Sequence, residues 1–139
     1  MPYENILNEY YKKGLIKKQN PDFNTIEKLI LRAQKDLTTA QATIPIDEGI
    51  AYSIAYLAML HAGRAMMLLK GYRPADGYQH KTVVEFMGYI LGKDYQTLVE
   101  RFDRMRKKRN VFIYEVSLSI SHTEAANALD TARKFVNLI

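Results

Sequence analysis

The chain has 139 residues, of which 47% are hydrophobic, and carries a formal net charge of +5. This length and composition fit one folded domain with a core and exclude intrinsic disorder. The absence of cysteine excludes disulfides, thiolate catalysis and cysteine-based zinc sites, and it fits a reducing compartment. The first residues lack the charged and apolar regions of a signal peptide. We therefore expect a cytoplasmic protein.

The spacing of apolar residues predicts helices, because no run alternates apolar and polar residues long enough for a strand in a sheet. An N-terminal arm, residues 1–20, holds a short helix that ends near Gly14. The second helix is expected to begin with Asn24 as its cap and Glu27 at the third position, and Pro45 closes it. Its apolar face consists of Ile26, Leu29, Ile30, Ala33, Leu37 and Ala40.

A central helix is predicted after Asp47, because nearly every position from Ile50 to Leu69 is apolar. His61 and Arg64 lie near its middle. A central arginine costs roughly 2.5–3.5 kcal/mol in a membrane, so this segment is interpreted as a buried helix and not as a membrane span. Both side chains face the apolar side, where His61 is expected to be a satisfied buried histidine. The expected acidic partners of this pair are Glu48, Asp103 or Glu115.

Three further helices complete the predicted fold. A short one runs from about His80 to Leu91, and Gly92-Lys93-Asp94 separates it from a long helix over Tyr95–Val116. The sequence Ser121-His122-Thr123-Glu124 matches the capping box of a last helix. The predicted fold is all-α, an antiparallel bundle of four or five helices that forms a domain over residues 21–139.

Arg109 occupies an unexpected place on the long helix. A projection at 100° per residue puts it near the centre of an apolar stripe, which consists of Leu98, Phe102, Met105, Phe112, Ile113 and Val116. A guanidinium is always charged, so its burial requires a carboxylate, a phosphate or a cleft shared between subunits. In the alternative interpretation, the aliphatic part of the Arg109 side chain lies over the core and its guanidinium stays in water. Asn110 and Tyr114 are four residues apart, and they add polar groups beside Arg109.

Basic residues cluster at Lys12–Lys18 and at Arg101–Arg109. Such clusters favour an anionic partner such as RNA or a nucleotide, or else form a solvated helix face. No two of the histidines His61, His80 and His122 have the spacing of a helical zinc motif, and no glycine-rich loop for phosphate is present. We therefore expect no metal and no cofactor. His80 is expected in a cap or loop role at the start of its helix, and His122 is expected to face water.

Several segments resemble the HEPN superfamily, which comprises small all-α prokaryotic proteins. The resemblance covers about Leu15–Ile139. It is carried by the central segment Ala51–Ala65, its run into Lys70–Pro74, the pair His80-Lys81, and the alanine-rich last helix that ends in Ala132–Val136.

The hallmark of this superfamily is an arginine, usually followed by a polar residue, with a histidine four to six positions on. Arg109 and Asn110 match its first part, and Tyr114 stands at the fifth position in place of histidine. Active members resemble metal-independent ribonucleases whose motif pairs across a dimer cleft. Many act as toxins beside a nucleotidyltransferase-fold antitoxin.

The resemblance therefore implies a homodimer whose cleft holds RNA or nucleotide against Arg106, Arg109, Asn110 and Tyr114. Tyrosine has a pKa of about 10 and replaces histidine poorly as a base near neutral pH, so we predict a binding module with weak or no catalysis. Two alternatives stay open. The first is a metal-independent endoribonuclease in which Arg109, Asn110 and Tyr114 are catalytic, and the second is a structural partner of a nucleotidyltransferase-fold protein.

Overall fold

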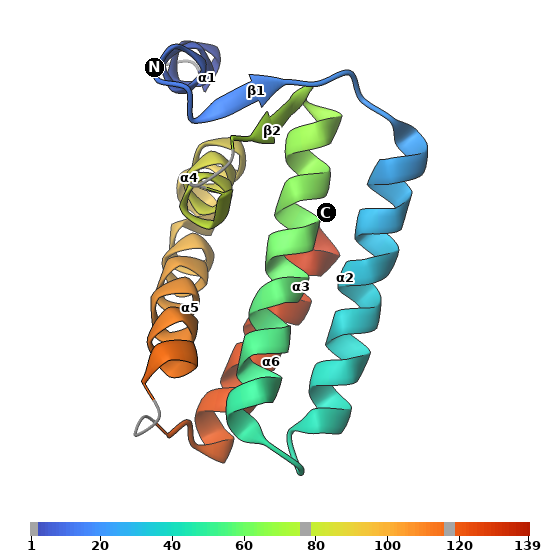
Figure 1. The fold of residues 1–139 in the computed structure, drawn as a ribbon, viewed down its shortest axis with the longest axis vertical. Coiled ribbons are helices and arrows are strands. Elements are labelled where there is room, and N and C mark those ends of the chain that lie inside the picture. The colour runs from blue at the N-terminus through green and yellow to red at the C-terminus, as the bar shows by residue number, and fades with distance from the viewer. Residues whose placement is uncertain (1–2, 76–78, 116–118) are drawn as a thin grey trace.

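A computed structural model describes residues 3–75, 79–115 and 119–139, and it shows a helical bundle with a small antiparallel ribbon at one end (Figure 1). This confirms the predicted all-α fold. The elements in chain order are α1 (Tyr3–Lys12), β1 (Ile16–Lys18), α2 (Phe23–Thr43), α3 (Glu48–Leu69), β2 (Tyr72–Pro74), α4 (Gln79–Leu91), the 3₁₀ turn η1 (Lys93–Tyr95), α5 (Gln96–Tyr114) and α6 (His122–Leu138).

Helix α3 is the centre of the bundle, as its apolar composition predicts. Helices α2 and α6 pack along it, and α4 and α5 follow one another along its other side (Figure 1). Small side chains at Ala51, Ala55, Ala58 and Ala62 are buried on α3 and let the neighbouring helices approach closely. None of the described helices combines the length and the apolar character needed to cross a membrane.

Gly63 sets the distance between α3 and α4. A Cβ atom added to Gly63 would lie 2.6 Å from Cγ1 of Val83 and 3.3 Å from Cγ of Met87. Both of those side chains are fully buried, so neither has room to move aside. The glycine therefore holds the first turns of α4, which begin with Gln79 and His80, against the middle of α3.

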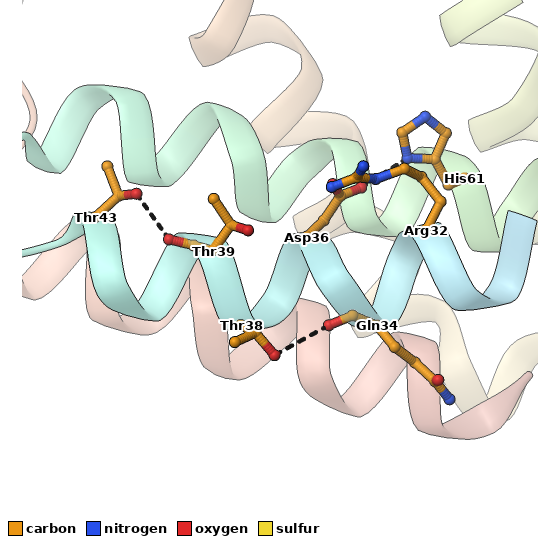
Figure 2. A network of polar contacts seen from close by, with 7 residues as sticks. All are labelled: Arg32, Gln34, Asp36, Thr38, Thr39, Thr43 and His61. Atoms are coloured by element: carbon orange, nitrogen blue, oxygen red, sulfur yellow. Dashed lines mark hydrogen bonds and ion pairs between the residues drawn. The ribbon is translucent and has the colours of Figure 1, made fainter.

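A buried carboxylate joins α2 to α3 (Figure 2). Asp36 accepts a hydrogen bond from Nε of Arg32 at 3.0 Å, and its other oxygen lies 2.7 Å from Nδ1 of His61. The predicted acidic partners of His61 were therefore wrong. The carboxylate comes from α2, which runs beside α3, whereas the named residues lie at the start of α3 and on or next to α5. The prediction that Arg64 faces the apolar side was also wrong, since this side chain is exposed.

Side chains cap the long helices where the sequence indicates, except that the cap of α2 lies two residues earlier than predicted. Asp47 caps α3, and Ser121 with Glu124 forms the predicted capping box of α6. Helix α2 begins earlier than predicted, because Asp22 is its cap and accepts a hydrogen bond from the backbone of Asn24 at 3.1 Å.

The N-terminal arm packs on the bundle through a ribbon that the sequence did not reveal. Strand β1 pairs with β2, with Ile16 opposite Pro74. The hydroxyl of Tyr10 donates to Glu85 on α4 at 2.8 Å, and Leu7, Tyr10 and Ile16 are buried in the same core as α3. Each strand has three residues, too few for an alternating pattern to be recognised.

Candidate anion-binding site

Arg109 lies near the end of α5 and is half-buried against α3. Its guanidinium carbon lies 5.9 Å from the centre of the Tyr56 ring, in the geometry of a cation–π contact. Nε of Arg109 is buried and has no hydrogen-bond partner among the residues that the structure describes. Buried polar atoms normally have a partner, so this atom marks a place where an acceptor is missing.

The neighbouring cations on α5 are in a different situation. Nε and Nη2 of Arg106 donate to one oxygen of Asp103 at 3.0 and 2.9 Å, and Nζ of Lys107 lies 3.2 Å from the other oxygen. Burial alone would raise the pKa of Asp103, but these hydrogen bonds and charges lower it below its ordinary value. Asp103 therefore stays ionised and neutralises part of the charge beside Arg109.

The structure adds His80 to this site. Nδ1 of His80 lies 2.8 Å from the hydroxyl of Tyr56, and the two rings are stacked with their centres 5.6 Å apart. Burial lowers the pKa of His80, and the positive charges of Arg109, Arg106 and Arg64 lower it further. His80 is therefore a neutral imidazole at neutral pH. The sequence had suggested only a cap or loop role for it.

Tyr56 connects the two groups of the site. Its side chain is fully buried, and burial raises its pKa well above the ordinary value. The hydroxyl therefore stays protonated, and it can donate a hydrogen bond to the unprotonated Nδ1 of a neutral His80. Arg109 rests on the ring of the same residue, so one tyrosine positions both the cation and the imidazole.

A comparison with protein families identifies the fold that carries this site. The family model of the HEPN domain matches residues 26–139, from α2 to the end of α6. The chain belongs to the HEPN family. The superfamily resemblance inferred from the sequence is thereby confirmed, whereas a search of curated proteins gave no match.

Within the HEPN domain, the motif residues take the following places. Asn110 is half-buried on α5, next to Arg109. Tyr114 is the last residue of α5, and its side chain, like Val116, lies outside the described part of the chain. The predicted stripe is buried at Phe102 and Met105 and half-buried at Leu98 and Phe112.

Ile113 is the exception on this stripe, because its side chain is 47% exposed. It follows Phe112 by one position and so lies about 100° further round the helix, beyond the side that packs on α3. Ile113 therefore belongs to the apolar stripe but lies outside its buried part.

A hollow of about 850 Å³ lies between α4 and α5 and reaches the site through Arg106 and Asp103. Its walls carry Lys81, Lys93 and Lys107, and Val84 and Val99 contribute apolar surface. Nowhere in the described ranges do three or more histidine, aspartate or glutamate side chains gather as they would around a metal ion. The described side chains of the site are guanidinium groups, the carboxylate of Asp103, a phenol and an imidazole.

Proposed function

We propose that this HEPN domain is an RNA- or nucleotide-binding module in which Arg109 receives a phosphate group. The buried, unpartnered Nε of Arg109 carries this proposal. A phosphate oxygen is a strong acceptor, and the planar fork of a guanidinium matches phosphate geometry. A phosphate at this position would supply the acceptor that the described residues lack.

The surrounding charge supports an anionic ligand. Arg64, Arg106 and Arg109 all lie close enough to His80 to lower its pKa. The whole chain carries a net charge of +5. Binding of a polyanion to such a cluster should weaken as salt rises, because counterions compete for the phosphates. The direct test is the RNA affinity of the wild type and of Arg109 variants over a series of salt concentrations.

We also propose that the module is a homodimer with the end of α5 at the contact. Ile113 is 47% exposed on this helix, and Ile50 on α3 is 44% exposed. The two helix ends are neighbours, since a Cβ atom on Gly49 would lie 2.2 Å from the tip of the Phe112 ring. A second copy that covers this end would remove aliphatic surface from water and enclose Arg109.

Light scattering at tens of micromolar should therefore give about twice the chain mass of 16.1 kDa. Ile113→Glu should shift the protein toward the monomer, because it places a charge in the apolar contact. Leu31→Glu is a matched control, since Leu31 is also exposed but lies on α2. A wild-type mass of one chain, or equal effects of both variants, would contradict the proposed contact.

A metal-independent ribonuclease is the second candidate function, and one observation favours it. His80 places an unprotonated imidazole beside Arg109, and an imidazole is the side chain best suited to move protons near neutral pH. The docking of a nucleotidyltransferase-fold protein and the toxin role stay predictions from the family resemblance.

We expect little or no cleavage of RNA by the wild type without metal, because Tyr114 replaces the histidine of the family motif. Tyr114→His should gain cleavage, and Arg109→Ala in the same background should lose it again. Gel analysis of one labelled RNA incubated with each variant provides the measurement. Strong wild-type cleavage that Arg109→Ala abolishes would establish the ribonuclease instead.

A further inference from the structure

We propose that His80 is the proton acceptor of the Arg109 site, so that a phosphate group bound at Arg109 brings a proton onto His80. This inference rests on the proposed function of Arg109. It goes further in assigning a role to a histidine that lies outside the sequence motif.

The geometry fixes His80 within the site. Its Nδ1 is held by the hydroxyl of Tyr56, whose ring also supports the guanidinium of Arg109. Tyr56 itself packs on Phe102 with ring centres 5.7 Å apart, and Phe102 packs on Phe135 at 5.0 Å. These aromatic side chains are fully buried, so they form a rigid support for both groups.

The charged groups around His80 come from α3, from α5 and from its own helix, α4. Helix α3 contributes Arg64 together with the neutral phenol of Tyr56, and α5 contributes Arg106 and Arg109. Two further carboxylates in this region already have cationic partners. Asp103 on α5 pairs with Arg106 and Lys107, and Glu85 on α4 lies 3.9 Å from Lys81. Protonation of His80 in the free protein is therefore opposed first by burial and then by three guanidinium groups.

A bound phosphate changes this balance. Its negative charge offsets the guanidinium groups that disfavour the imidazolium, so the pKa of His80 should rise on binding. The pKa is then higher in the complex than in the free protein. Affinity must consequently increase as pH falls through the pKa of the complex, and it levels off below the pKa of the free protein. The same hydroxyl of Tyr56 can accept a hydrogen bond from Nδ1–H once the ring is protonated.

The test uses a short oligouridine without terminal phosphates, because its phosphodiesters keep a constant charge between about pH 5.5 and 8. Fluorescence anisotropy at fixed ionic strength should show an affinity that increases about fivefold or more over this range as pH falls, since one pKa unit corresponds to a tenfold change. His80→Asn should flatten this dependence. His122→Asn is the matched control and should keep it, because His122 is exposed at the start of α6.

Nuclear magnetic resonance of the imidazole signals provides a second readout. In the free protein, the pKa of His80 should lie below that of an ordinary imidazole, and saturation with the oligouridine should move it upward. An affinity that depends on Arg109 but not on pH would overturn the role of His80 and leave the proposed function intact. If the oligouridine does not bind at any pH, the proposed RNA-binding function is contradicted, and the role of His80 that rests on it is contradicted as well. A free His80 whose pKa is not lowered below that of an ordinary imidazole would overturn the inference even if RNA binds.

Discussion

Replacing Arg109 with alanine is expected to weaken RNA binding by about 10- to 100-fold, the effect of losing a charge-assisted hydrogen bond from a partly buried site. The same change at Lys107 should weaken binding by about threefold or less, because exposed charges contribute little. Lys107 is a matched control on the same helix, since its side chain is 67% exposed and lies beside Asp103. Fluorescence anisotropy with one RNA at several salt concentrations measures both variants.

Two controls separate a role in binding from damage to the fold. Arg109→Lys keeps the charge but loses the planar fork, so it should bind RNA between the wild type and Arg109→Ala. Thermal unfolding of each variant shows whether the bundle is intact. Equal losses for Arg109→Ala and Lys107→Ala would indicate a nonspecific basic surface, and they would remove the argument from the unpartnered Nε.

Replacing Gly63 with alanine is expected to lower the free energy of unfolding by about 2 kcal/mol, the usual cost of overpacking a core. The added methyl would lie 2.6 Å from Cγ1 of Val83, which is fully buried. The gain of about 1 kcal/mol in helix propensity offsets only part of this cost. Because α4 must move to make room, His80 should also lose its hydrogen bond to Tyr56. Urea denaturation followed by circular dichroism measures the stability.

Gly88 on α4 is the matched control for this prediction. A Cβ atom there would meet Cγ1 of Val99 at 3.4 Å, close to an ordinary contact. Gly88→Ala should therefore leave stability unchanged or raise it by up to about 1 kcal/mol, through helix propensity alone. A destabilisation of similar size in both variants would show that the close approach of α3 and α4 does not depend on Gly63.

The helices could be predicted because their signals are local. The apolar run before Leu69, the break at Gly92 and the capping box at Ser121 each depend on residues within a few positions of one another. The start of α2 was misplaced because Asp22 and Asn24 are both good caps and only the backbone geometry chooses between them. The carboxylate of Asp36 was missed as the partner of His61 because the register of α2 against α3 is not a local property.

The candidate site was predictable only in part, for the same reason. Arg109 was recognised because a cation interrupts an apolar stripe on its own helix. Tyr56 and His80 lie on two other helices, and no spacing rule connects them with Arg109. Their role follows from burial and distance, which the sequence pattern does not contain. The superfamily resemblance did include the pair His80-Lys81, and this was the one sequence signal that pointed to the start of α4.

The ribbon of β1 and β2 also bears on the entropy of chain closure. A two-stranded ribbon of three residues per strand is at most marginally stable alone. Here β1 precedes α2 and β2 follows α3, and these two helices lie antiparallel (Figure 1). Their packing already brings Ile16 and Pro74 to the same end of the bundle. The pairing of the two strands therefore adds little further loss of chain entropy, because the packed helices have already brought the ends of the loop together. The helical hairpin has thus supplied most of the ordering, and the strand pairing acts together with the burial of Leu7 and Tyr10 to hold the N-terminal arm on the bundle.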